Sequence, residues 1–218
     1  VGVACGAVNG FFVSVCGIPP FISTLGMMTL LRGVILVYTK GSPIPIKVDS
    51  YKFFGKGSIA GIPVPVIILI VVFLLAHYIL TQTTYGRSVY AVGGNREAAR
   101  LSGIRVKTSE FLVYTLNGLM CGMAGLILTA RLGSAQSTSG TGIEMDAIAA
   151  VILGGTSLSG GVGFVLPTVV GAMIMGIIDN ILTLMNVNPH ATNIVKGAVI
   201  LIAVLVDKKV KDLSAKAE

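Results

Sequence analysis

The sequence predicts an all-α fold: a polytopic transmembrane helical bundle with one discontinuous helix and one short helix on the cytoplasmic side. Apolar residues make up 54% of the chain and charged residues only 11%, whereas soluble domains carry about 25% charged residues. A run of about 18 or more apolar residues is long enough to cross a bilayer as a helix. Long uncharged runs cover residues 1–31, 57–86, 111–130 and 147–178.

The first part of the chain contains three apolar segments, at residues 1–15, 21–39 and 62–83. The first two are separated by residues 17–20, which end in two prolines, because proline cannot continue a helix. A polar loop at residues 40–61 precedes the third. Glycines recur at every fourth position of the first segment, which leaves one face bare for close helix packing: Gly2, Gly6 and Gly10.

The second part begins with a polar stretch at residues 85–109. Four further apolar segments follow, at residues 110–130, 143–153, 162–185 and 190–206. The first of these carries Gly118 and Gly122 as another small-residue face. The short segment 143–153 cannot cross alone, because a crossing takes about 20 residues, and the run 154–161 interrupts the helix after it. We therefore expect a transmembrane domain at residues 1–206 and a cytoplasmic basic tail at residues 207–218.

Basic residues indicate the orientation, since cytoplasmic loops are enriched in Lys and Arg. The stretch 85–109 holds five basic residues against one acid, Glu97, and the tail holds four lysines. Counting the short segment as a crossing places both on the cytoplasmic side. One loop disagrees with this topology, because four lysines fall on its outer side: Lys40, Lys47, Lys52 and Lys56.

Several functional classes are excluded by what the sequence lacks. The net charge of +7 fits the basic flanks of membrane spans, and no aromatic-basic pattern of RNA-binding proteins occurs, so we expect no nucleic-acid partner. The phosphate-binding pattern GxxxxGK[ST] is absent, so the chain is not expected to hydrolyse ATP. An enzyme would need clustered His, Asp or Cys, and the two histidines, His77 and His190, lie far apart in sequence.

A short helix is predicted inside the polar stretch 85–109. Asn95 can accept a hydrogen bond at the helix start, and Gly103 can end the helix in the left-handed conformation. Glu97 suits the positive end of the helix dipole. Ala98 and Ala99 are expected to present a flat face that the groove of a partner can cover. An ordinary solvated helix explains the spacing alone equally well.

Longer motifs resemble those of ribose-type monosaccharide permeases of ATP-binding-cassette (ABC) importers. The resemblance covers nearly the whole chain, and its pattern Glu97-Ala98-Ala99 followed by Gly103 looks like the family's coupling loop. The matching stretches are residues 85–104, 130–136 and 144–161, with shorter matches at 21–26, 32–33 and 195–197.

The resemblance implies a solute importer of the bacterial inner membrane that works as a permease homodimer in the lipid bilayer. Its partners would be an ABC ATPase, which binds ATP and Mg²⁺, and an extracytoplasmic sugar-binding protein. The coupling residues carried over are Asn95, Glu97, Ala98, Ala99, Arg100 and Gly103. Family members are longer at the N-terminus, so we expect this chain to be N-terminally incomplete.

Two further groups of residues are candidates for the substrate route. The break at 154–161 offers backbone and hydroxyl groups to a sugar if it lies at membrane depth; the alternative is a tight surface turn. Its candidate residues are Gly154, Gly155, Thr156, Ser157 and Ser159. Asp179 and Lys196 lie inside apolar runs, at similar depth in an antiparallel hairpin. They are a gate pair, a structural ion pair, or two charges that reach the surface separately.

Other solute permeases and other transporter classes remain alternatives. Within ABC permeases, carriers for nucleosides or branched-chain amino acids are the nearest alternatives to a sugar permease. An ion-coupled secondary transporter or channel would need intramembrane acids for coupling. Asp179 is the one clear candidate for such an acid, and the 85–109 motif would then have no explanation.

Overall fold

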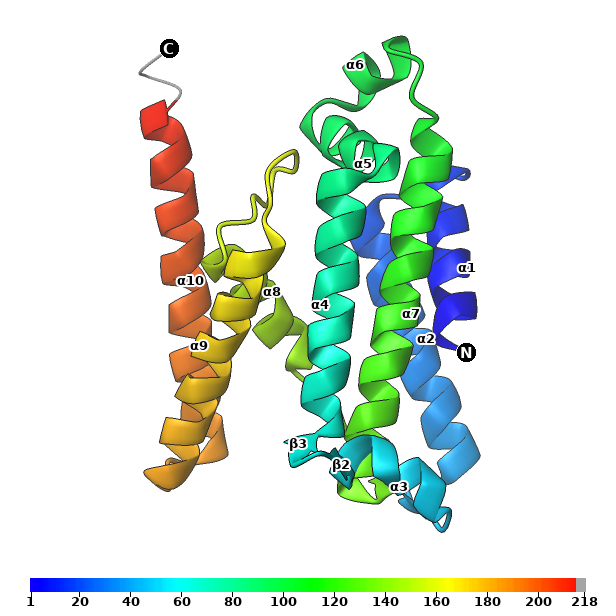
Figure 1. Cartoon of the computed structure of the whole chain (residues 1–218), viewed down its shortest axis with the longest axis vertical. Coiled ribbons are helices and arrows are strands. Elements are labelled where there is room, and N and C mark those ends of the chain that lie inside the picture. Colours follow the sequence, from blue (N-terminus) through cyan, green and yellow to red (C-terminus); the bar gives the residue numbers. More distant parts are fainter. Residues whose placement is uncertain (215–218) are drawn as a thin grey trace. The chain divides into compact units, whose positions relative to one another are not determined.

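The structure is a computed structural model that describes the backbone of residues 1–214 and the side chains of residues 1–188 and 191–205 (Figure 1). The chain divides into two compact units, one formed by residues 1–140 and the other beginning at Thr141. Within the described part, four helices are long and apolar enough to cross a membrane: α2, α4, α7 and α9. The predicted all-α polytopic class is confirmed.

The first unit contains four of the expected apolar helices (α1, α2, α4 and α7), the predicted short helix α6 and several elements that the sequence did not predict. Its helices are α1 (Gly2–Ser14), α2 (Pro20–Thr39), α3 (Asp49–Lys56), α4 (Val64–Gln82), α5 (Thr84–Gly94), α6 (Arg96–Leu101) and α7 (Val106–Leu132). Its strands are β1 (Ile44–Pro45), β2 (Ser58–Ile59), β3 (Ile62–Pro63) and β4 (Ser134–Ala135). The interpretation of residues 40–61 as a plain loop was wrong, since they form α3 and most of a small hairpin.

Helices α1 and α7 pack with their backbones in direct contact. A Cβ atom added to Gly6 would lie 2.9 Å from the Cα atom of Gly118, and one added to Gly2 would lie 3.0 Å from the Cα atom of Gly122. Real Cβ atoms essentially never come closer than 3.0 Å to such atoms. The two predicted small-residue faces therefore face each other, and the absence of side chains permits the contact.

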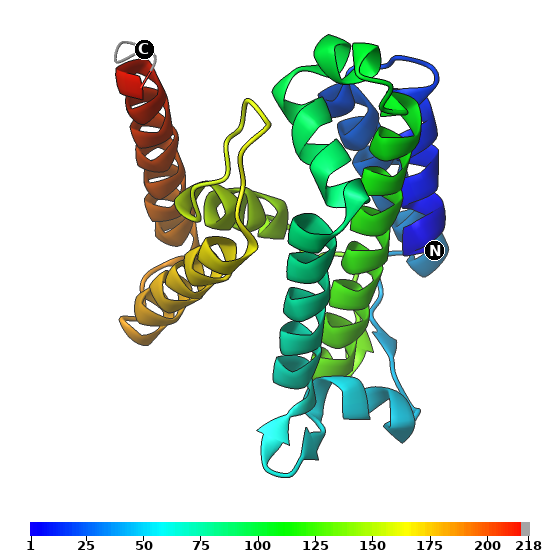
Figure 2. The same ribbon diagram turned by 45° about the horizontal axis from the view of Figure 1, so that its top comes forward.

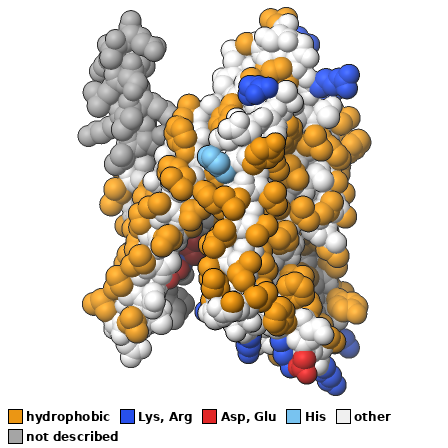
Figure 3. All heavy atoms as spheres, viewed as in Figure 1, with side chains coloured by type: hydrophobic (Ala, Val, Ile, Leu, Met, Phe, Trp, Pro, Cys, Tyr) orange, Lys and Arg blue, Asp and Glu red, His pale blue; other side chains and the backbone are white. Residues whose placement is uncertain are grey.

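The unit has two distinct ends, because α4 and α7 run along its length (Figures 1 and 2). Helices α5 and α6 lie at one end, and α3 with the strands lies at the other. At the α3 end, β1 pairs antiparallel with β4, and the hydroxyls of Tyr51 and Thr129 are 2.7 Å apart. Basic side chains and an acidic side chain are visible at this end in Figure 3. The α3 end therefore carries the lysines that disagree with the positive-inside rule.

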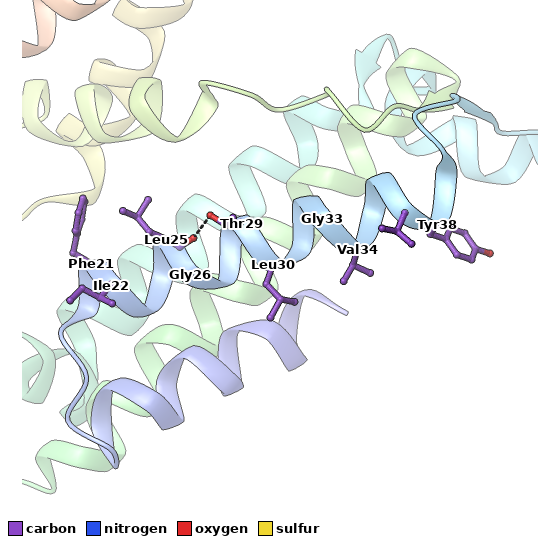
Figure 4. Close-up of a pocket in the computed structure, with 10 residues that line it drawn as sticks. Phe21, Ile22, Leu25, Gly26, Thr29, Leu30, Gly33, Val34 and Tyr38 are labelled. Atoms are coloured by element: carbon purple, nitrogen blue, oxygen red, sulfur yellow. Dashed lines mark hydrogen bonds between the residues drawn. The ribbon is translucent and has the colours of Figure 1, made fainter.

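Helix α2 presents an open apolar face. An open hollow runs along it, lined by Phe21, Leu25, Leu30 and Val34 among others, whose side chains project from one helix (Figure 4). In a chain with few charges, such a face suits contact with lipid or with another apolar helix.

The second unit consists of α8 (Ile143–Leu153), α9 (Val165–Leu184) and α10 (Pro189–Ser214). Its small core contains the buried residues Ala149, Ala150 and Met175, with Val199 and Ile200 of α10 packed against it. Helix α8 has 11 residues and is about 16 Å long, so it is too short to cross a bilayer, as predicted. Helix α10 continues to Ser214, past residue 207, where the tail was expected to begin. The side chains of the tail lie outside the described residues.

Candidate functional site

The end of the first unit that carries the pattern Glu97-Ala98-Ala99 is formed by α5, α6 and the start of α7. The sequence did not predict α5, which begins where Thr83 accepts a hydrogen bond from the Gly86 backbone N–H at 3.2 Å. A Cβ atom on Gly86 would lie 2.6 Å from the carbonyl oxygen of Ile79. This close contact lets α5 turn back against the end of α4.

Both ends of α6 follow from local chemistry, as predicted. The Asn95 Oδ1 atom accepts a hydrogen bond from the Ala98 N–H at 2.9 Å, which satisfies a backbone donor in the first turn. At the other end, Gly103 has φ +82°, a conformation that glycine adopts without strain. The N–H of Gly103 bonds to the Arg100 carbonyl, and that of Ile104 to the Ala99 carbonyl. These two bonds form a Schellman stop.

The two alanines of the motif do not share a face. Ala99 is only 4% exposed and packs inside the unit, whereas Ala98 is exposed. Successive helical residues are rotated by about 100°, so the expected flat double-alanine face was wrong. The outer face instead pairs Ala98 with Leu101, which is 82% exposed. The i, i+3 spacing of these two residues was the signal that sequence reasoning missed.

Charged groups surround this outer face. Within α6, Arg100 Nη2 lies 2.9 Å from Glu97 Oε2. A second pair joins different helices: Arg96 Nε and Nη2 donate to Glu110 Oε1 and Oε2 at 2.8 and 2.9 Å. The hydrogen bonds to the Glu110 carboxylate raise the pKa of the Arg96 guanidinium above its usual value. Neither Arg96 nor Glu110 was among the predicted site residues.

The predicted substrate segment joins α8 to α9 in the second unit. Gly154 is buried, and a Cβ atom there would lie 2.6 Å from the backbone N of Thr168. The Ser157 N–H bonds to the Val162 carbonyl at 2.9 Å, and the Ser157 Oγ accepts a bond from the Ser159 N–H at 3.2 Å. The segment is thus an ordered series of turns. Gly155 and Ser159 are exposed, while Thr156 and Ser157 are half-buried.

The structure brings Asp179 and Lys196 together and adds a third charge. The Lys196 Nζ atom on α10 lies 2.9 Å from Asp179 Oδ1 on α9. It also donates a hydrogen bond to Asp146 Oδ2 on α8 at 2.7 Å. One ammonium therefore joins the three helices of the second unit. Asp146 was not predicted, because it stands in the first turn of α8, which the sequence placed next to a loop.

Comparisons with known proteins identify the family. A family model described as "Branched-chain amino acid transport system / permease component" matches residues 1–204. The chain belongs to this permease family. The match includes α6, the segment between α8 and α9, and the cluster of Lys196, Asp146 and Asp179.

Several curated relatives carry the names of sugar permeases. The chain is 51% identical to the ribose import permease protein of Escherichia coli over 213 residues, which are 96% of this chain and 66% of the relative. It is 48% identical to the ribose import permease protein of Bacillus subtilis, over 92% of this chain and 63% of the relative. Identity to the D-allose transport system permease protein of Escherichia coli is 41%, over 95% of this chain and 64% of the relative.

The chain thus spans slightly less than two thirds of the length of these relatives. No solved structure matches it.

Proposed function

We propose that this chain is the transmembrane permease subunit of an ATP-driven ABC importer for ribose or a similar monosaccharide in the bacterial inner membrane. The observation that carries the proposal is its identity of 51% to a ribose import permease, over 96% of the chain. Other relatives are named for D-allose and L-arabinose transport. The chain is proposed as a transport subunit, with ATP and Mg²⁺ bound by a separate ATPase.

The outer face of α6 is the proposed contact with that ATPase. It combines one exposed leucine, one exposed alanine and the Glu97–Arg100 pair. Small and apolar residues within a charged rim suit insertion into a groove of a partner protein. The remaining proposed partners are a second permease copy and an extracytoplasmic sugar-binding protein.

A neutral sugar needs hydrogen bonds more than charges along its route. The segment between α8 and α9 offers Thr156, Ser157 and Ser159 together with glycine backbone groups. In the proposed cycle, ATP binding closes the ATPase dimer and moves α6. The permease helices then open the route outward to sugar released by the binding protein, and hydrolysis resets them.

A permease for branched-chain amino acids is the second candidate, because the matching family is described by that activity. Uptake of radiolabelled ribose into reconstituted vesicles, with ATP inside and binding protein outside, separates the two candidates. We expect unlabelled ribose or allose to compete and leucine to have no effect. Competition by leucine alone would assign the chain to the amino-acid branch, and uptake driven by an ion gradient without ATP would indicate a secondary transporter.

The ATPase contact is tested by co-purification from native membranes in mild detergent. Ala98→Arg places a long cation on the outer face of α6, so we expect the ATPase to be lost while the permease remains inserted. Ala60→Arg is the matched control, because Ala60 is an exposed alanine in the β2–β3 turn at the opposite end of the unit. Equal recovery of the ATPase with both variants would refute the assignment of α6.

A further inference from the structure

The Arg96–Glu110 pair connects the proposed ATPase-binding helix directly to a membrane-spanning helix. Arg96 is the first residue of α6, and Glu110 stands in the second turn of α7. The guanidinium and the carboxylate meet through two parallel hydrogen bonds, at 2.8 and 2.9 Å. The Glu110 side chain is 18% exposed and that of Arg96 is 56% exposed. The carboxylate is thus held against the body of the unit, while the arginine reaches it from outside.

A forked contact of this kind fixes orientation as well as distance. Two parallel N–H···O bonds hold the guanidinium and carboxylate planes in one geometry, which a single bond cannot do. The covalent link between the helices is less restrictive, because it passes through the Gly103 turn and residues that belong to neither helix. The fork is therefore the contact that makes the start of α6 and the start of α7 move together.

Helix α7 is suited to carry such a movement into the membrane. It has 27 residues and is about 40 Å long. Along its length the backbone of α7 contacts α1 at Gly118, and its last turns contact α3 through Thr129. A displacement of its first turns is passed to these packed neighbours, because close-packed contacts transmit strain.

We infer that the Arg96–Glu110 pair is the positioning contact through which an ATPase-driven movement of α6 is passed to α7. This inference rests on the proposed function. The Glu97–Arg100 pair cannot serve the same purpose, since both partners belong to α6. Arg96 and Glu110 would therefore set how much transport each ATP produces, whereas Ala98 and Leu101 would set whether the ATPase binds.

The test uses the permease–ATPase complex reconstituted in vesicles with its sugar-binding protein, and measures ribose transported per ATP hydrolysed. Arg96→Glu and Glu110→Arg each replace the attraction with a repulsion, and the double variant restores opposite charges in exchanged positions. We expect each single variant to retain the ATPase and to lower the ratio at least about fivefold, which lies within the range of measured coupling between sites. The double variant should recover most of the ratio.

Lys107→Glu is the matched control. It makes the same change in charge on the first turn of α7, and Lys107 is exposed without a carboxylate partner in the described part of the chain. The ratio should stay near the wild-type value in this variant.

Three outcomes would overturn the inference. The first is an unchanged ratio in both single variants. The second is a loss of complex stability or of ATPase binding with the ratio preserved, which would make the pair merely structural. The third is a double variant as poorly coupled as the single ones. A wild-type permease that transports ribose without any ATPase would instead overturn the proposed function, which keeps the two failures distinguishable.

Discussion

Two glycines on α9 allow a matched test of how α8 and α9 are held together. Gly171 is buried against α8, where an added Cβ atom would meet the Ala150 carbonyl oxygen and lie 3.0 Å from its carbonyl carbon. The same atom would lie 3.1 Å from the N of Gly154. Gly176 is exposed, and nothing in the described structure lies within 4 Å of a Cβ atom there. We predict opposite effects of alanine at the two positions.

The expected difference in stability between the two variants is what remains after the effect common to both substitutions is subtracted. Each replaces a helical glycine by alanine, which favours the helix by up to about 1 kcal/mol. Gly171→Ala also forces one methyl group into a close-packed contact, and such overpacking costs about 1–3 kcal/mol. The methyl would also displace the Ala150 carbonyl, which accepts a hydrogen bond from the Gly154 N–H at 3.0 Å, at the end of α8. The two variants should therefore differ in stability by about 1–3 kcal/mol.

Thermal denaturation in detergent measures this difference. The chain has no tryptophan, so the fraction that stays monodisperse after heating, followed by size-exclusion chromatography, is the suitable readout. For a chain of this size, 1 kcal/mol corresponds to about 2–4 °C, so Gly171→Ala should denature about 2–12 °C below Gly176→Ala. If the two midpoints coincide, the α8–α9 backbone contact does not hold the unit together and the reasoning is refuted.

Three further predictions concern α6 and the charged cluster. Leu101→Asp should abolish co-purification of the ATPase and leave the melting temperature unchanged, because the side chain is 82% exposed; retention of the ATPase would contradict the proposed surface. Gly103→Val should cost about 1–2 kcal/mol through left-handed strain and lower ATPase binding, whereas normal melting and binding would count against the Schellman stop. Lys196→Met should lower stability, because Asp146 and Asp179 lose their shared ammonium; the loss should be smaller than the roughly 3–5 kcal/mol of a fully buried pair, since the side chains are partly exposed. Replacing both acids by asparagine in that variant should recover stability in the same melting assay, and no recovery would contradict the charge argument.

The membrane helices could be predicted because their signal is local. A span needs a long uncharged run and little else, so the predicted bounds of α1, α2, α4 and α8 agree with the structure within about two residues. Helix α3 gave no comparable signal. It has eight residues, and it is held by contacts with distant residues: Tyr51 bonds to Thr129, and Gly55 packs on the backbone of Arg131. Such short elements depend on tertiary packing, which single-sequence patterns do not contain.

At the candidate site, too, local features could be predicted from the sequence, and features that depend on packing could not. The ends of α6 were predictable, since the Asn95 cap and the Gly103 stop act on groups within a few residues. Its inner and outer faces were not, because burial of Ala99 depends on how the neighbouring helices lie around a helix of only six residues. The partner of Arg96 is likewise set by the packing of α6 beside α7.

Asp146 illustrates why charge patterns must be read together with helix packing. An antiparallel hairpin of α9 and α10 brings Asp179 close to Lys196, and that pairing could be inferred by counting residues from the turn. The position of Asp146 depends instead on α8, which does not cross a bilayer and so has no depth that can be counted from its ends. The structure places its first turn against α10 through Lys196.

The last turn of α8 lies against α9 through Gly154 and Gly171. A helix too short to be held by crossing the membrane is therefore fixed at both ends, by an ion pair at one and by backbone contact at the other. The segment that follows it begins at the end fixed by backbone contact. This arrangement fixes the start of the segment that carries Thr156 and Ser157, whose hydroxyl groups belong to the proposed sugar route.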